Sequence, residues 1–219
     1  CNRILSRYCS FGLWLMGVQV EVAGKMQVLN SNQNHLVVSN HLSYLDVLVL
    51  SQLFHTGFVT SQEIRETPLL GQMCTLAGCL FVERRNKKNI HKEIAELTEA
   101  LKRGLNVVIF PEATSTNGES VLRFRRPLYM AAIDAEAPVL PICLNYKTID
   151  GQALTQSNRD QVCWYGDMSF APHLWRLMKA QKVVVEVRFL DALETSLSDD
   201  PAKLAETSHG VVSEHFAPF

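Results

Sequence analysis

Residues 37–50 read VVSNHLSYLDVLVL, and this stretch joins a β-branched run to an apolar segment of helical length. The run that ends at Asn40 predicts a short strand, and residues 44–54 predict a helix by their length and periodicity. Strand, short connection and helix in this order are the first unit of an α/β fold. His41 and Asp46 therefore stand at the junction of two apolar elements.

The alternation of strand and helix continues along the chain. Residues 105–110 are almost entirely apolar, as in a central strand that is buried on both faces. We therefore predict a single α/β domain over residues 24–219, with a central mixed, mostly parallel sheet flanked by helices. The other expected strands are 57–60, 79–83 and 138–147, and the other expected helices are 68–78, 89–104, 126–137 and 199–216.

The N-terminal segment, residues 1–23, is predicted to form a separate apolar helix that associates with the membrane. It carries Phe11, Trp14, Leu15 and Met16 on about three helical turns. Such a helix either packs on the domain core or lies in the lipid interface, where Trp and Arg are favoured. No run reaches the ~18–20 apolar residues that span a bilayer, and no signal peptide is visible. Because the chain opens on Cys1, we expect a preceding segment that could include a membrane anchor.

Composition and charge exclude some classes of protein. Hydrophobic residues make up 47% and charged residues 20%, as in an ordinary globular domain. The formal net charge of −1 argues against a nucleic-acid-binding protein, which needs many Lys and Arg contacts to phosphate. The six cysteines form no C-x-x-C pair and no Cys and His cluster with zinc-ligand spacing. We therefore expect reduced thiols in a protein that faces the cytosol, and no metal site.

His41 and Asp46 have the spacing of a catalytic dyad. Positions five apart on a helix are about 140° from each other, so His41 must lie outside the helix. Ser43 and Asp46 form a capping box, with Ser43 as N-cap and Asp46 in the first turn. From there, the carboxylate can hold the imidazole tautomer and raise its basicity. The alternative is a purely structural pair, and a serine hydrolase is excluded because there is no G-x-S-x-G motif.

Polar and basic clusters follow other elements of the predicted sheet. Glu112 and Thr114 come directly after the buried strand, at the kind of strand end where α/β sheets build their sites. Each cluster also has a simpler explanation as a solvated loop or face. In a nearly neutral chain, however, local basic groups can recognise phosphate, anionic lipid or an acidic carrier. The two basic clusters are Arg84, Arg85, Lys87 and Lys88, and Arg123, Arg125 and Arg126.

Four blocks of the chain, in order, resemble those of the glycerolipid acyltransferases, the 1-acylglycerol-3-phosphate acyltransferase family. NHLSYLD (40–46) is similar to the N-H-x-S-x-x-D block and GCLFVER (78–84) to the G-x-x-F-[IV]-x-R block. FPEATST (110–116) is similar to F-P-E-G-T-R-S, and VLPICL (139–144) to V-x-P-[IV]. The likeness covers residues 37–146, and WYGDMSFAPHLW (164–175) also resembles a bacterial branch.

This resemblance implies transfer of a fatty acyl group from a thioester, of coenzyme A or acyl carrier protein, to a lysolipid hydroxyl. His41 would be the general base, and Asp46 would orient it. Arg84 would bind the anionic head group of the acceptor and Glu112 its polar atoms, with Thr114 in the same wall. No metal or redox cofactor is implied. The resemblance also implies phospholipid synthesis by a peripheral or monotopic protein on the cytoplasmic face of the inner membrane.

The chain departs from the family pattern where positive charge is expected. The family's G-T-R is Ala113, Thr114 and Ser115 here, and Ser61 stands where the family often has lysine. An unpaired phosphate in a partly buried site is costly. Either Arg125 or an adjacent arginine therefore replaces the missing charge, or the acceptor differs. The expected acceptor is 1-acylglycerol-3-phosphate, and the alternative is another lysolipid such as lyso-ornithine lipid, which has a zwitterionic head group.

Two interpretations from other classes stay open. One is a lipid- or carrier-binding protein without chemistry, and the other is a thioesterase that passes the acyl group to water. A degenerate binding protein would be expected to lose His41 or Asp46 first, and both are present. A thioesterase would release thiol from an acyl thioester without added lysolipid.

Overall fold

The computed structural model describes residues 2–24, 34–53, 56–61, 66, 71–72, 80–82, 90–196 and 198–219, and only the backbone of residues 2–5, 56–61 and 80–82. An eight-stranded sheet runs through these residues in the order β1-β8-β6-β2-β5-β3-β4, with β7 paired to β6. Its strands are β1 (Val18–Gly24), β2 (Leu36–Ser39), β3 (Thr56–Ser61), β4 (Leu80–Val82), β5 (Asn106–Ile109), β6 (Val139–Ile149), β7 (Gln152–Ala153) and β8 (Val183–Phe189).

Most neighbouring strands in this sheet are parallel. β1 and β8, β2 and β5, β2 and β6, β3 and β4, and β3 and β5 pair in parallel. β6 pairs with β7 and with β8 in the antiparallel sense. The predicted mixed, mostly parallel sheet is therefore confirmed.

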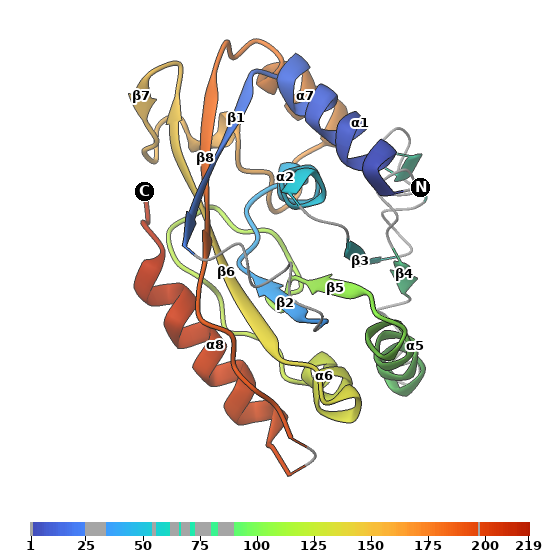
Figure 1. The fold of residues 1–219 in the computed structure, drawn as a ribbon. Coiled ribbons are helices and arrows are strands. Elements are labelled where there is room, and N and C mark those ends of the chain that lie inside the picture. Colours follow the sequence, from blue (N-terminus) through green and yellow to red (C-terminus); the bar gives the residue numbers. More distant parts are fainter. Residues whose placement is uncertain are drawn as a thin grey trace.

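Helices cover both faces of the sheet (Figure 1). One face carries α1 (Asn2–Leu15), α2 (Leu45–Leu53) and α7 (Phe170–Leu177), and the other carries α5 (Ile90–Lys102), α6 (Met130–Ala135) and α8 (Pro201–His215). The helix expected over residues 126–137 begins as a 3-10 turn, Pro127–Tyr129, and continues as α6. The helix expected over residues 68–78 lies largely outside the described residues.

β5 shows why the sheet needs helices on both sides. Successive side chains of a strand point to opposite faces. Val108 packs in the core beneath α1 and α2, whereas Val107 and Ile109 pack in the core beneath α5, α6 and α8. The expectation that this strand is buried on both faces is confirmed. The same two cores bury the free thiols of Cys9 and Cys143, and burial raises the pKa of Cys143 to about 12.

The N-terminal helix, α1, is present but is not apolar throughout. Its sequence includes Asn2, Arg3, Ser6, Arg7 and Ser10 among the apolar residues. Cys9 and Leu13 of α1, and Met16 just after it, are buried in the same core as α2. In the described part of the chain, no helix combines the length and the apolar character needed to cross a bilayer.

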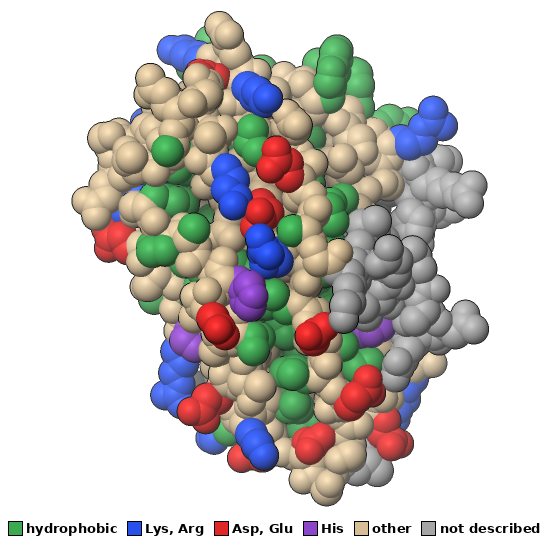
Figure 2. Space-filling view, turned by 60° about the vertical axis from the view of Figure 1, so that its left-hand side comes forward, with side chains coloured by type: hydrophobic (Ala, Val, Ile, Leu, Met, Phe, Trp, Pro, Cys, Tyr) green, Lys and Arg blue, Asp and Glu red, His purple; other side chains and the backbone are tan. Residues whose placement is uncertain are grey.

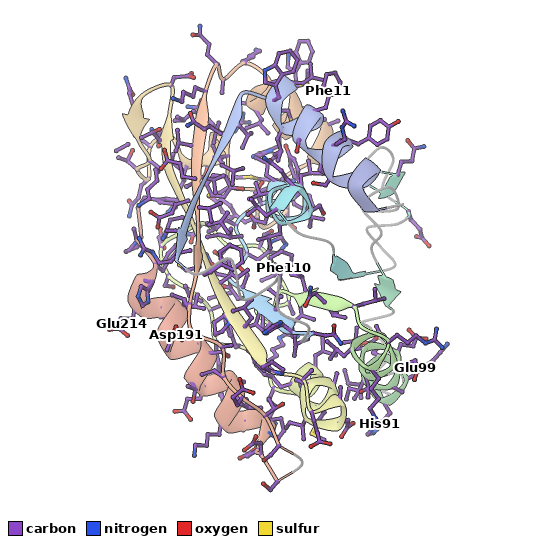
Figure 3. The ribbon with its side chains drawn as sticks, viewed as in Figure 1. Phe11, His91, Glu99, Phe110, Asp191 and Glu214 are labelled. Carbon is purple, nitrogen blue, oxygen red and sulfur yellow. The ribbon has the colours of Figure 1, made fainter. Side chains whose placement is uncertain are left out.

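The sheet brings the two polar loops together. β2 and β5 are parallel neighbours, with Val38 opposite Ile109, so their carboxyl ends meet. His41 follows the end of β2, and Glu112 follows the end of β5. Phe110, the residue after β5, lies at the centre of the molecule beside this edge (Figure 3). This is the edge at which open α/β sheets commonly place ligands.

Candidate active site

The connection between β2 and α2 has the geometry predicted from the sequence. His41 lies in the loop before the helix, and Asp46 lies in the first turn of α2. The backbone N–H of Ser43 donates to Oδ2 of Asp46 at 2.9 Å, while Ser43 Oγ accepts from the N–H of Leu45 at 3.4 Å. The half of the capping box in which Asp46 accepts from Ser43 N–H is therefore confirmed, whereas Ser43 Oγ bonds to the N–H of Leu45 and not to that of Asp46.

His41 and Asp46 are in direct contact. Nδ1 of His41 lies 2.9 Å from Oδ2 of Asp46, and the His41 side chain is 19% exposed while Asp46 is fully buried. Because an ionised carboxylate only accepts, Nδ1 carries the proton and Nε2 keeps its lone pair. The ring of Phe110 stacks on the imidazole, with centroids 4.0 Å apart and planes 14° apart. The pair can therefore take up a proton at Nε2.

The buried carboxylate of Asp46 has several hydrogen-bond donors around it. Oδ2 also accepts from the N–H of Leu42 at 2.7 Å, and Oδ1 accepts from the hydroxyl of Tyr146 at 2.7 Å. Burial, and then the charge of Asp46, raise the pKa of Tyr146 well above its usual value, so this phenol stays protonated and donates. Hydrogen-bond donors on both oxygens offset the cost of burying a carboxylate and hold it in one orientation.

Glu112 supports the loop that carries His41. Its Oε1 accepts from the backbone N–H of His41 at 2.7 Å, and its Oε2 accepts from the N–H of Leu122 at 2.8 Å. The side chain is only 3% exposed. Burial raises the pKa of Glu112 to about 7, although the two backbone bonds act in the opposite direction, and the charge of Asp46 adds to the rise.

The loops on either side complete the support of the His41 loop. The C=O of His41 accepts from the N–H of Thr116 at 2.9 Å, and the C=O of Leu42 accepts from the N–H of Trp164 at 2.9 Å. Ser115 Oγ in turn donates to the C=O of Trp164. The backbone groups around His41 are thus hydrogen-bonded by the 112–116 loop, by Trp164 and by Asp46, and such bonds hold a side chain in one position.

Comparison with known proteins assigns the chain to a family. The Acyltransferase family model matches residues 19–145. The chain belongs to the acyltransferase family. A 1-acyl-sn-glycerol-3-phosphate acyltransferase of Neisseria gonorrhoeae is 32% identical over 183 residues, which are 82% of this chain and 69% of the relative.

A further relative and one solved structure are also similar to this acyltransferase. A lyso-ornithine lipid O-acyltransferase of Brucella abortus is 33% identical over 201 residues, which are 88% of this chain and 74% of the relative. The crystal structure of the 1-acyl-sn-glycerophosphate (LPA) acyltransferase of Thermotoga maritima has a TM-score of 0.67 at 19% identity, and covers 97% of this chain and 77% of that one. The similarity to that structure shows that the fold is shared.

The third block of the acyltransferase carries its departures from the family pattern in a tight turn. Ala113 stands in the family's glycine position and has a φ of 62°, in the left-handed region that glycine adopts without strain. Thr114 is exposed in the same loop. Ser115, in the family's arginine position, is turned toward the backbone of Trp164. In place of the family's arginine, Ser115 therefore forms a hydrogen bond that joins this loop to residues 164–168.

The structure describes only some of the basic residues that were predicted to bind the acceptor. Of the second block, the structure describes only the backbone of β4, so Arg84 lies outside the described residues, as does the side chain of Ser61, and the binding role of Arg84 stays a prediction. Arg125 is exposed, and its N–H donates to the C=O of Pro111 at 2.9 Å. It lines a groove of about 890 Å³ between the 123–127 segment and α8, together with Arg123, Arg126, Glu206 and His209.

Tyr146 is the site residue that sequence reasoning missed. It follows the V-x-P-[IV] block on β6, 100 positions from Asp46. A signal was present in the alternation along this strand. Leu140, Ile142, Leu144 and Tyr146 all face the core that contains α2. A tyrosine hydroxyl on that face needs a buried partner, and the first turn of α2 supplies one.

Proposed function

We propose that the protein transfers a fatty acyl group from an acyl thioester to the hydroxyl of a lysolipid, with 1-acylglycerol-3-phosphate as the acceptor. The observation that carries this proposal is the contact between His41 Nδ1 and buried Asp46 at the carboxyl edge of the sheet. It leaves Nε2 of His41 as a general base on a loop held from every side. Both curated relatives described above are named for acyl transfer to a lysolipid.

The chemistry follows from this base. The lysolipid hydroxyl gives its proton to Nε2 of His41 as its oxygen attacks the thioester carbonyl. The tetrahedral intermediate then collapses, the C–S bond breaks, and the imidazolium returns the proton to the departing thiolate. Asp46 stabilises the imidazolium between these two transfers. An ester and a free thiol are the products, and because the thioester is already activated, no acyl-enzyme, metal or redox cofactor is needed.

The donor in this proposal is coenzyme A or acyl carrier protein, and the acceptor is held by basic and polar groups. Arg125, whose backbone N–H is bonded to the C=O of Pro111 next to Glu112, replaces the charge that Ser115 lacks. Arg84 contributes from the second block, and Thr114 contacts the acceptor from its exposed position. Glu112 contributes to acceptor binding mainly by holding the loop, since both of its oxygens accept from backbone N–H groups.

A lysolipid acceptor requires access to a membrane. We place the protein at the cytoplasmic face of the inner membrane, as a peripheral or monotopic protein that contacts lipid through α1. Tyr8, Phe11, Trp14 and Leu15 of this helix are exposed by 56–71%. Large apolar side chains at such exposure mark interaction surfaces.

The second candidate acceptor is lyso-ornithine lipid. Ser115 favours it, because the residue in the family's arginine position is a serine bonded to Trp164. A zwitterionic head group needs less positive charge than a phosphate monoester does. A relative with that name is 33% identical to this chain.

One assay tests both acceptors and the class of reaction. The protein is incubated with acyl-coenzyme A or acyl-acyl carrier protein and a panel of lysolipids, and product masses and free thiol are measured. We expect an acylated lysolipid, and we expect its formation to stop in His41→Ala but not in the matched control His91→Ala, an exposed histidine of α5. Thiol release that is independent of lysolipid would indicate a thioesterase, and no thiol or product would indicate a binding protein.

The role of Arg125 is tested by kinetics with the preferred acceptor. We expect Arg125→Ala to raise the KM for the acceptor at least tenfold and to leave the KM for the donor nearly unchanged. Lys102→Ala, at the end of α5, is the matched control for removal of an exposed charge. A change confined to the donor KM would reverse the assignment.

A further inference from the structure

The last turns of α1 and α7 lie next to each other. α1 leads into β1 and α7 leads into β8, and these strands are parallel neighbours whose first residues, Val18 and Val183, are paired. The N–H of Val183 donates to the C=O of Gly17 at 2.9 Å. Both helices therefore end at one corner of the molecule, at the top of Figure 1.

Exposed apolar side chains gather at this corner. Trp14 and Leu15 in the last turn of α1 are 71% and 61% exposed, and Trp175 and Met178 at the end of α7 are 65% and 55% exposed. Phe11 lies on the outward side of α1 (Figure 3) and stacks on Trp14, with ring centroids 5.8 Å apart. Together with Tyr8, one turn earlier, these side chains form the docking face: Tyr8, Phe11, Trp14, Leu15, Trp175 and Met178.

The exposure is not a sign of loosely attached helices. Leu13 of α1 is 1% exposed, and Leu177 of α7 is fully buried, and both belong to one core. Each helix thus has an apolar side that the protein covers and a second apolar side that it leaves open. Large open apolar surfaces of this kind mark sites of association.

The charges near the docking face indicate the kind of partner that it contacts. Residues 2–17 and 170–182 contain no Asp or Glu, although the chain as a whole carries a formal charge of −1. Elsewhere the signs are mixed, and Figure 2 shows acidic and basic side chains interspersed over one face of the molecule. The basic residues of the two segments are Arg3, Arg7, Arg176, Lys179 and Lys182. A second copy of this surface would be repelled, whereas an anionic bilayer attracts it and accepts Trp and Leu at its interface.

We propose that α7 is a second membrane-contacting helix, which seats the protein on an anionic bilayer together with α1. The choice of a lipid surface rests in part on the proposed acylation of lysolipids. α7 is also joined to the catalytic loop, because His173 Nδ1 lies 3.0 Å from the hydroxyl of Tyr44, between Ser43 and α2. Trp164, in the segment before α7, donates to Leu42. Seating α7 on the bilayer therefore sets the position of the His41 loop relative to the lipid.

The experiment is partitioning of the whole chain onto vesicles of phosphatidylcholine, alone or mixed with phosphatidylglycerol. We expect Trp175→Ala with Met178→Ala to weaken binding to the mixed vesicles at least tenfold, and Arg176→Gln with Lys179→Gln to weaken it by a similar factor. The matched controls are Leu105→Ala, an apolar residue 49% exposed after α5, and Lys102→Gln with Lys203→Gln. Unchanged vesicle binding of both α7 variants would overturn the proposal.

A spectroscopic measurement keeps the proposal testable if a variant folds poorly. With Trp14→Phe and Trp164→Phe, the remaining Trp175 is expected to shift its emission to the blue on addition of mixed vesicles and to be quenched by brominated lipid. No shift would contradict the proposal, as would a wild-type dimer that the α7 variant converts to monomer without altered vesicle binding. Vesicle binding needs no catalysis, so a protein that binds through Trp175 but acylates no lysolipid would leave this proposal standing and remove the proposed function.

Discussion

Tyr146 is the residue whose removal best tests the proposed catalytic dyad, His41 and Asp46. Its hydroxyl and the backbone of Leu42 and Ser43 hold Asp46 against His41. In Tyr146→Phe the carboxylate loses the donor to Oδ1 and is held only through Oδ2, by His41 and by the backbone of Leu42 and Ser43. We expect kcat to fall about tenfold, since misplacement of a catalytic group by a fraction of an ångström is costly.

A second buried tyrosine serves as the control. The hydroxyl of Tyr129 lies 2.6 Å from Ser208 Oγ, far along the chain from the dyad, and is also buried. Tyr129→Phe removes a buried hydrogen bond and is expected to lower the free energy of unfolding by about 1 kcal/mol. Its kcat should match that of the wild type. If both variants lowered kcat equally, the effect of Tyr146 would be structural.

Glu112 predicts a pH dependence of stability. Its pKa of about 7 in the folded protein exceeds the ordinary value of 4.5. The folded state thus holds this proton more tightly than the unfolded chain, so the free energy of unfolding falls as pH rises from 4.5 to about 7, by about 3 kcal/mol at most. Glu112→Gln cannot ionise. We expect its free energy of unfolding in urea to vary less with pH over this range. If the free energies of variant and wild type changed with pH in parallel, Glu112 would not have the raised pKa assigned to it.

Residues close in sequence were predictable, and those joined through the fold were not. The positions of His41, Ser43 and Asp46 follow from helix geometry over a few residues. The bond between Asp46 and Tyr146 depends on the pairing of β2 with β6, which no local pattern specifies. The bonds of Glu112 to the backbone of His41 likewise require the carboxyl ends of β2 and β5 to meet.

At the scale of elements, the loop after β5 depends on the last residues of the chain. Phe219 N–H donates to the C=O of Gly118 at 3.2 Å, and the Phe219 ring lies where a Cβ on Gly118 would be. Gly118 has a φ of +80°, so Gly118→Ala both strains the backbone and displaces the ring. We expect the free energy of unfolding to fall by about 2–3 kcal/mol, measured by urea unfolding.

A second glycine isolates the contact with Phe219. Gly151 has nearly the same φ, +79°, but nothing lies within 4 Å of a Cβ placed there. Gly151→Ala should therefore show the backbone strain alone, about 1–2 kcal/mol. Phe219→Ala should restore Gly118→Ala to the level of Gly151→Ala. Equal costs for the two glycine variants would mean that the C-terminal residues do not hold this loop.

Element positions were predicted better than element boundaries. α8 was expected over residues 199–216 and spans Pro201–His215, because Asp200 caps it by accepting from the N–H of Ala202 at 2.8 Å. α6 is shorter than expected, since Pro127 opens a 3-10 turn and Glu136 ends the helix in a left-handed conformation, with a φ of 49°. Such ends are decided by local hydrogen bonds rather than by apolar periodicity.

At the scale of the whole molecule, the class of fold followed from the order of its elements. A chain of alternating strands and helices usually folds into a mostly parallel sheet that helices cover on both faces. The strand order could not be predicted from the sequence, because β1 and β8 are neighbours in the sheet although almost the whole chain separates them. Their pairing brings the ends of α1 and α7 close together. The predicted boundary between an N-terminal segment, residues 1–23, and a separate domain stays a prediction. β1, which extends across that boundary, pairs with β8 over all seven of its residues.

Of the two roles that the sequence left as alternatives for the N-terminal helix, packing on the core is observed and contact with lipid is proposed. Cys9, Leu13 and Met16 are buried in the core with α2, and full burial of a side chain of this size contributes about 1.5–3 kcal/mol. Deletion of residues 1–17 should therefore lower the free energy of unfolding by about 5 kcal/mol, a large part of the total for a domain. Trp14→Ala with Leu15→Ala, which changes exposed residues of the same helix, should leave the urea midpoint unchanged and weaken vesicle binding. A truncated chain with the wild-type midpoint would show instead that α1 serves the membrane alone and that the core closes without it.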